Sequence, residues 1–262
     1  RQLSRMQNNV DDFKKVALHI FLPVILICGL IAMANLSTAL MIGFSCCVLF
    51  FIGRIKIAHL SILAVSGILL FGILFGVSKL TGFGRAATWE SRLQSFISND
   101  KEDIPFQVTQ AKIAQAKGGI FGVGPGNSSQ RNFLPHPYSD CIYSIIIEEY
   151  GLLFGGVGLV FLYLLFLWRS ILIFRRCPFA FGAFLAVGLS FTLVFQAFLN
   201  MAVNVNLVPV TGLTLPLVSM GGSSIWFTCL AIGIILSVSR FVETAEGNEN
   251  RIVEEIMQNN HQ

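Results

Sequence analysis

Long apolar stretches alternate with short polar segments along this chain of 262 residues. A helix crosses a bilayer with about 20 predominantly apolar residues, and the chain has six stretches close to or above that length. The expected spans cover residues 16–34, 38–53, 58–78, 141–168, 179–203 and 217–239, of which the second is short. The pattern therefore predicts an all-α integral membrane protein with six transmembrane helices.

One polar segment is much longer than the others and separates the spans into two groups of three. Within it, residues 106–117 are expected to form a short amphipathic helix at the membrane interface. The polar tail after Arg240 is typical of a disordered segment or a short surface helix. The expected organisation is a cytoplasmic segment at 1–15, three spans at 16–79, an extracytoplasmic loop at 80–139, three spans at 140–241 and a cytoplasmic tail at 242–262.

Composition and charge support this interpretation, because only 12% of the residues are charged and a soluble domain carries about 25%. The net charge of +4 is distributed in blocks between the spans, and no nucleic-acid partner is expected. The positive-inside rule assigns Lys- and Arg-rich short loops to the cytoplasm. It places both termini there and the 80–139 loop outside. The basic segments are residues 1–15, Arg54 with Lys56, residues 169–176 and Arg240.

The six cysteines fall mostly inside apolar stretches, and neither they nor the four histidines have the spacing of a metal site. They are expected to be buried free thiols, and no metal-ligating residue is predicted. The chain begins at Arg1 without a methionine, so it is expected to be part of a longer protein.

Asp140 is the carboxylate that most needs a functional explanation, because it leads directly into a strongly apolar stretch. An ionisable group at the mouth of a membrane helix is costly and is a functional candidate by default. Two interpretations are open. Asp140 is a general base for chemistry in the outer loop, or it only caps the N-terminus of the following span, where Asp and Ser are favoured.

Glycines and cations in the same loop suit a phosphate-bearing ligand. Gly122 and Gly124 belong to a glycine-rich run whose backbone N–H groups could meet phosphate oxygens. Glu148 shares a helical face with Asp140 and is expected to lie below it in one groove. Such a groove fits a lipid-linked diphosphate whose tail lies between helices. The candidate anion ligands, unless they are only solvated or bound to lipid head groups, are Arg85, Arg92, Lys112, Lys117 and Arg131.

A second polar group occurs at 209–224, where Gly221 and Gly222 are followed by Ser223 and Ser224. These residues are expected to let backbones pack closely or to break a helix at membrane depth against protein or a wet cavity. A polar stripe also marks the fifth span. It consists of Gln196, Asn200 and Asn204, which either hold helices together or line a substrate cavity.

Three segments of the chain resemble the SEDS family of bacterial cell-wall proteins (shape, elongation, division and sporulation), and its FtsW branch more than its RodA branch. They are SRLQSF at 91–96, GGIFGVGPGNSSQRNFLPHPYSDCIYSIIIEEYG at 118–151 and FQAFLNMAVNVNLVPVTGLTLPLVSMGGSS at 195–224. Members have about ten spans of membrane-crossing length. The resemblance thus implies the C-terminal part of that fold, without its first four spans.

The resemblance carries the essential aspartate of the family onto Asp140. The sequence departs from the family pattern at His136, Cys141 and Met220, and at residues 33–38, where a family carboxylate is replaced by Asn35. From the resemblance and the residues together, the candidate substrate-binding set is Arg85, Arg92, Gln107, Gln110, Gly122, Gly124, Ser128, Arg131, Glu148, Gln196, Asn200, Ser219, Gly221, Gly222, Ser223 and Ser224.

The function that the resemblance implies is a peptidoglycan glycosyltransferase that polymerises lipid II on the outer face of the bacterial cytoplasmic membrane during cell division. Asp140 would be its general base, and a divalent cation such as Mg²⁺ or Mn²⁺ could help the diphosphate to leave. The implied partners are lipid II, a class B penicillin-binding protein, other divisome membrane proteins and membrane lipids. The alternatives are a lipid II flippase and a non-enzymatic divisome scaffold.

Overall fold

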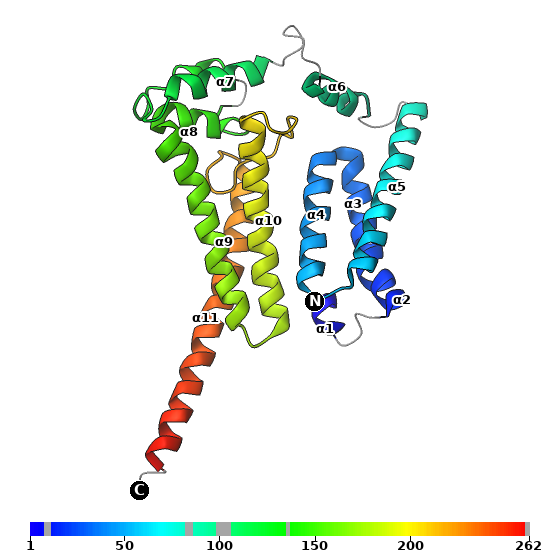
Figure 1. Cartoon of the computed structure of the whole chain (residues 1–262), viewed down its shortest axis with the longest axis vertical. Coiled ribbons are helices and arrows are strands. Elements are labelled where there is room, and N and C mark those ends of the chain that lie inside the picture. The colour runs from blue at the N-terminus through cyan, green and yellow to red at the C-terminus, as the bar shows by residue number, and fades with distance from the viewer. Residues whose placement is uncertain (8–11, 82–85, 98–105, 135–136, 260–262) are drawn as a thin grey trace.

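The computed structural model of this chain describes residues 1–7, 12–81, 86–97, 106–134 and 137–259, and every regular element in these ranges is helical (Figure 1). The all-α prediction is confirmed. The elements are α1 (Gln2–Arg5), α2 (Phe13–Val16), the π-helix η2 (Ala17–Phe21), α3 (Leu22–Ala34), α4 (Leu36–Ile52), α5 (Ile57–Thr81), α6 (Ala86–Ile97), α7 (Phe106–Gly118), the 3-10 helix η3 (Gln130–Asn132), α8 (Ile142–Gly151), the π-helix η4 (Leu152–Val157), α9 (Gly158–Arg176), α10 (Ala180–Asn204) and α11 (Gly222–Asn259).

Five helical segments of the described chain are long and apolar enough to cross a membrane. A sixth apolar helix, α4, has 17 residues and coincides with the short second span that the sequence predicts. The chain is therefore a multi-pass membrane protein. The number of spans reaches the six expected from the sequence when α4 is counted as a membrane span. The five longer segments are Phe13–Ala34, Ile57–Val77, Ile142–Arg176, Ala180–Asn204 and Gly222–Ala245.

The helices form two groups that meet where α4 packs against α10 (Figure 1). One group contains α3, α4 and α5, and the other contains α8 to α11. Near the centre of the interface, the Phe44 ring lies 4.7 Å from the Phe195 ring, centroid to centroid. Where the C-terminal end of α4 meets the N-terminal end of α10, Phe50 and Phe184 belong to one buried cluster. Apolar packing therefore joins the two groups along their length.

The two ends of the bundle differ in charge. The N-terminus and the turn between α9 and α10 lie at one end in Figure 1, together with the link between α4 and α5. Those segments carry the basic residues on which the orientation was predicted. Helices α6, α7 and α8 lie at the other end, near the turn at Asn35. The candidate site residues from the long loop thus gather at the less basic end.

The long span expected at 141–168 falls within the apolar helical segment Ile142–Arg176, but the chain bends sharply at Gly151. This residue has φ 79° and ψ 172°, a conformation that glycine adopts easily. The N–H groups of Leu152 and Leu153 donate to the carbonyls of Gly119 and Ile120, at 2.9 and 3.2 Å. As a result α8 packs against α7 at the end of the bundle. Only the part after the bend runs down through the bundle (Figure 1).

Two other boundaries differ from the sequence prediction. The last span begins at Gly222 instead of residue 217, and α11 continues as one helix to Asn259 instead of ending near residue 239. The preceding segment, 205–221, is non-helical but largely enclosed, and Leu213, Leu215 and Ser219 in it are buried. Irregular backbone at such a position requires hydrogen-bond partners from the protein. The helix expected at 106–117 is α7, whereas α6 was not expected as a helix.

Candidate functional site

Asp140 lies in the turn just before α8, and its carboxylate does not cap that helix. The N-cap residue of α8 is Cys141, which makes no side-chain cap hydrogen bond. The Asp140 carboxylate instead accepts a hydrogen bond of 3.0 Å from the hydroxyl of Ser139, and the residue is half-buried. Of the two interpretations open from the sequence, capping is not supported.

The backbone around Asp140 is fixed by side chains from two other parts of the chain. The Asp140 carbonyl accepts hydrogen bonds from the amide nitrogens of Asn200 and Asn204, at 3.0 and 2.8 Å. The hydroxyl of Ser219 donates to the Ser139 carbonyl at 2.6 Å. Because both asparagines and Ser219 are buried, these contacts hold Asp140 in place from α10 and from the 205–221 segment.

The polar stripe of α10 therefore acts mainly as an attachment for irregular backbone. Asn200 also donates to the Leu213 carbonyl at 2.6 Å, and Gln196 donates to the Thr214 carbonyl at 2.9 Å. The amide donors of these side chains are occupied by protein acceptors. Of the two roles left open by the sequence, holding elements together fits this geometry better than lining a cavity. Asn200 and Ser219 are thus positioning residues, which corrects their assignment as substrate contacts.

Residues 221–224 form the start of α11. Gly222 and Ser223 are exposed, and Gly221 is half-buried. The hydroxyl of Ser224 lies 3.0 Å from that of Thr214. The helix break expected near Gly221 and Gly222 is therefore present. Ser224 links the start of α11 to the 205–221 segment, which side chains of α10 hold in place.

A cavity of about 750 Å³ lies between α4, α6, α10 and the 205–221 segment. We call it the α6 cavity. Its wall includes Arg92, whose guanidinium donates to the Val210 carbonyl at 3.2 Å. A Cβ built on Gly212, another wall residue, would lie 3.7 Å from a carboxylate oxygen of Asp140. Asp140 is not itself a lining residue, but its carboxylate lies next to Gly212 in the wall formed by the 205–221 segment. The cavity is lined by Ala34–Ser37, Leu40, Met41, Phe44, Thr88, Trp89, Arg92, Phe195, Leu199 and 208–212.

The glycine-rich run does not offer free N–H groups to a phosphate at Gly122 and Gly124, which corrects that prediction. The N–H of Gly122 donates to the Gly118 carbonyl at 2.8 Å, and that of Gly124 donates to the Glu149 carbonyl at 3.0 Å. A Cβ on Gly122 would lie only 2.3 Å from the same Glu149 oxygen. These glycines allow the loop to pack directly on the backbone of α8.

Glu148 is fully buried and does not line a groove below Asp140, contrary to the prediction. Its carboxylate accepts hydrogen bonds from the Ser128 hydroxyl at 2.5 Å and from the backbone N–H of Ser129 at 3.2 Å and of Gln130 at 3.3 Å. The ammonium of Lys117 lies 3.8 Å away. Glu148 and Ser128 therefore fasten the loop to α8 and are not substrate contacts in this arrangement.

Of the remaining predicted residues, Gln107, Gln110 and Arg131 are described and lie outside the wall of the α6 cavity. The amide of Gln107 donates to the thiol of Cys141 at 3.0 Å, and burial raises the pKa of that thiol. Gln110 and Arg131 are half-buried. Arg85 and His136 lie outside the described residues. Of the predicted cations that the structure describes, Arg92 is thus the one in the cavity wall.

Sequence reasoning did not single out Gln115 or Trp89. The amide of Gln115 donates to the Asn204 carbonyl at 2.7 Å and to the Ser144 hydroxyl at 3.1 Å, which ties α7 to α8 and α10. Trp89 lines the α6 cavity. An isolated sequence gives no signal for Gln115, because its partners are 29 and 89 positions away.

No group of three or more His, Cys, Asp or Glu side chains that could hold a metal ion occurs among the residues that the structure describes. Among the described lining residues of the α6 cavity there is no carboxylate, and that of Asp140 lies next to Gly212 of the wall. The described residues alone therefore do not form a metal site made of protein ligands.

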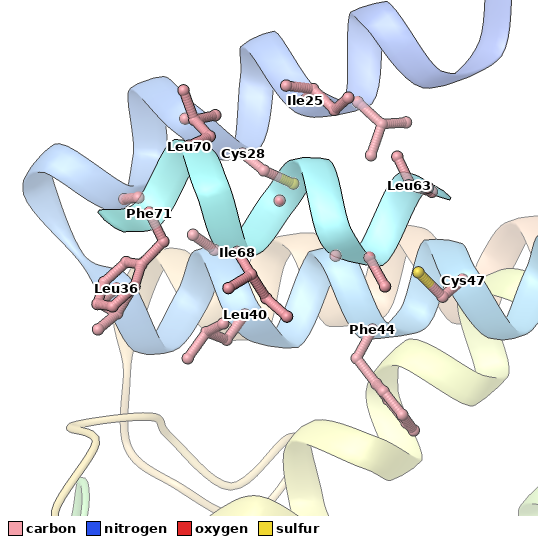
Figure 2. A pocket seen from close by; sticks show the side chains of 17 residues that line it. Ile25, Cys28, Leu36, Leu40, Phe44, Cys47, Leu63, Ile68, Leu70 and Phe71 are labelled. Atoms are coloured by element: carbon pink, nitrogen blue, oxygen red, sulfur yellow. The ribbon is translucent and has the colours of Figure 1, made fainter. Parts of the chain in front are cut away.

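An apolar pocket of about 360 Å³ lies between α3, α4 and α5 (Figure 2). We call it the α3–α5 pocket. Figure 2 shows Ile25 and Cys28 of α3 and Leu63 and Leu70 of α5 around it. Leu36, Leu40 and Phe44 of α4 line both this pocket and the α6 cavity. A wholly apolar site and a polar one therefore meet at the same stretch of α4.

Comparison with known proteins identifies the family. A family model described as "Cell cycle protein", for FtsW, RodA and SpoVE, matches residues 1–244. The stage V sporulation protein E of Bacillus subtilis is 35% identical over 246 residues, which is 91% of this chain and 64% of that protein. The probable peptidoglycan glycosyltransferase FtsW of Coxiella burnetii is 34% identical over 247 residues, with 90% of this chain and 63% of that protein covered.

Solved structures agree on the fold. A chain from a peptidoglycan synthase complex, whose title concerns the coordination of polymerization and crosslinking, superposes with a TM-score of 0.65 at 25% identity and covers 92% of this chain and 66% of that one. The rod shape determining protein RodA of Thermus thermophilus gives a TM-score of 0.55, with 91% and 63% covered. This chain thus spans a little under two thirds of the length of these sequence relatives. The match over residues 1–244 confirms the resemblance to SEDS proteins: the chain belongs to the FtsW, RodA and SpoVE family of cell cycle proteins.

Proposed function

We propose that this protein is a peptidoglycan glycosyltransferase that polymerises lipid II, with Asp140 as its general base. The observation that carries the proposal is the position of Asp140. Its carboxylate lies next to Gly212, a residue of the α6 cavity wall, and its backbone is fixed from α10. The names of the FtsW relatives support the reaction class.

The proposed reaction joins two lipid-linked sugars. The 4-hydroxyl oxygen of a GlcNAc residue forms a bond to the anomeric carbon of a MurNAc residue, and the bond from that carbon to undecaprenyl diphosphate breaks. A sugar hydroxyl is a weak nucleophile. Transfer of its proton to a positioned carboxylate contributes about 10²–10⁴-fold. Asp140 accepts that proton.

The leaving diphosphate needs positive charge at the moment when its negative charge increases. Arg92 is the described cation in the wall of the same cavity, so it is assigned this role. Because the described residues offer no cluster of metal ligands, we propose that any Mg²⁺ or Mn²⁺ binds largely through the phosphates of the substrate, as Mg²⁺ commonly does. The test is to compare activity with and without added divalent cation.

The apolar tail of the substrate is assigned to the α3–α5 pocket. That pocket is lined by apolar side chains and thiols, and it shares Leu36, Leu40 and Phe44 with the α6 cavity. Burial of hydrocarbon contributes about 0.8 kcal/mol per CH₂ relative to water, although much less relative to lipid. The pocket therefore orients the tail more than it increases affinity.

The proposed orientation is supported by the basic segments at one end of the bundle. The positive-inside rule puts that end in the cytoplasm, and Asp140 then faces the outside of the bacterial cytoplasmic membrane. A class B penicillin-binding protein and other divisome membrane proteins are the proposed partners. The relative in a complex for polymerization and crosslinking supports a crosslinking partner, and the FtsW and sporulation relatives support division or a related process.

The flippase alternative would use polar side chains along a membrane path, with a site near the midplane. The amide donors of Gln196, Asn200 and Asn204 are engaged by protein acceptors, which favours the enzyme. The test is to mix the purified full-length protein with lipid II, with and without a class B partner, and to measure glycan product and lipid translocation separately. Glycan product supports the proposal. Translocation without product supports the flippase, and neither activity supports a scaffold.

A further inference from the structure

Trp89 of α6 has the position of a binding platform in the α6 cavity. It is half-buried and lines the cavity together with Thr88 and Arg92. Its ring lies against that of Phe71, with centroids 5.8 Å apart and an interplanar angle of 30°. Beside it, Lys79 of α5 pairs with Glu90 at 3.2 Å. The contact with Phe71 places the indole against α5, while the residue still contributes surface to the cavity.

The other walls of the cavity offer hydrogen-bonding groups without further charge. Asn35 and Ser37 line it from the start of α4, and Thr211 lines it from the 205–221 segment. The hydroxyl of Thr211 is buried and has no hydrogen-bond partner within the described part of the chain. A buried polar group without a partner is costly. The oxygen itself has almost no accessible surface, so this hydroxyl lies inside the wall and is not presented to the cavity.

This combination fits a neutral sugar ring. A pyranose has one face of C–H groups, which packs on the electron-rich face of an aromatic ring, and it has hydroxyls around its edge. A cavity of about 750 Å³ is within the usual range for small-ligand sites, roughly 300–1,000 Å³. We propose that Trp89 is the stacking platform for a pyranose ring of the substrate, beside Arg92, with the polar side chains of Asn35 and Ser37 in the same wall for the edge of that ring. The inference rests on the proposed function and assigns the sugar-binding part of that site.

The test separates sugar binding from tail and diphosphate binding. Full-length protein carrying Asp140→Asn, which prevents turnover, is titrated with lipid II and with undecaprenyl diphosphate, which has no sugar. We expect Trp89→Ala in this background to weaken lipid II binding by about tenfold and to change undecaprenyl diphosphate binding by less than about twofold. Trp89→Phe should retain most of the affinity. Trp226→Ala is the matched control, because Trp226 is 80% exposed and lies outside the cavity wall.

Equal weakening of the binding of both ligands by Trp89→Ala would overturn the proposal, and so would unchanged binding of both.

A spectroscopic measurement covers the case in which Trp89→Ala fails to fold. Trp168 and Trp226 are 56% and 80% exposed, so replacing both with Phe, together with any tryptophan outside these 262 residues, leaves Trp89 as the single tryptophan. Its emission should change on addition of lipid II but not of undecaprenyl diphosphate. An unchanged emission with lipid II would contradict the proposal. Failure of the parental protein to polymerise lipid II would instead contradict the proposed function, so the two failures are distinguishable.

Discussion

The side-chain amide of Asn204 donates a hydrogen bond of 2.8 Å to the main-chain carbonyl of Asp140, a residue 64 positions earlier in the chain. The same amide donates to Asn200, and its oxygen accepts from the Ser144 hydroxyl at 2.9 Å. One buried side chain thus connects the last turn of α10, the turn that carries the candidate base and the first turn of α8. The position of the Asp140 carboxylate depends on this connection.

Asn204→Ala should therefore lower the rate of polymerisation more than the affinity for lipid II. The substitution leaves buried groups without partners, at a cost of about 1–3 kcal/mol in stability. A displacement of the base by about 1 Å can cost about 10²-fold in rate. The rate constant at saturating lipid II and the apparent affinity are measured separately, together with thermal unfolding. Asn132→Ala, at an exposed position, is the control. A parental rate for Asn204→Ala would contradict the positioning role.

Glu148→Gln should loosen the loop that precedes the candidate base. The buried carboxylate accepts from Ser128 and from the N–H groups of Ser129 and Gln130. An amide would place an NH₂ group against some of these donors. We expect a loss of about 1–3 kcal/mol in stability and faster proteolysis of the loop in the folded protein. Glu149→Gln, at the adjacent half-buried position, should leave both measurements near parental values. Equal effects of the two substitutions would show that the contacts of Glu148 are unimportant.

Gly122→Ala and Gly126→Ala separate backbone strain from steric overlap. Both glycines have positive φ, 82° and 79°, so alanine costs about 1–2 kcal/mol in conformational strain at either position. At Gly122 the new Cβ would also lie 2.3 Å from the Glu149 carbonyl, whereas Gly126 has nothing within 4 Å. Thermal unfolding should show a markedly larger loss for Gly122→Ala. Equal losses would mean that the loop does not pack on α8 in this way.

The spans could be predicted from sequence because length and hydropathy are local properties. The predicted ranges 58–78 and 179–203 nearly coincide with α5 and α10. The bend at Gly151 could not be predicted in the same way. Residues 152–157 are as apolar as their neighbours, and the bend is stabilised by carbonyls of Gly119 and Ile120. Contacts between residues far apart in the sequence therefore determine the bend at Gly151.

The candidate site was only partly accessible from sequence for the same reason. Asp140 was identifiable because a carboxylate leading into an apolar stretch is unusual. The glycine-rich run suggested phosphate binding, but the N–H groups of Gly122 and Gly124 are occupied by backbone carbonyls. Among several loop cations, the choice of Arg92 required knowing that α6 forms a wall of the cavity. Trp89 gave no signal at all without that wall.

The central claim is that the Asp140 carboxylate accepts the proton of the attacking sugar hydroxyl. The most direct test is the rate of glycan formation from lipid II by purified full-length protein carrying Asp140→Asn, with binding of lipid II measured on the same preparation. Asparagine preserves the size of the side chain and its main-chain contacts to α10, but removes the base. The account predicts that the rate falls by about 10²–10⁴-fold while lipid II still binds. Polymerisation at the parental rate would contradict it.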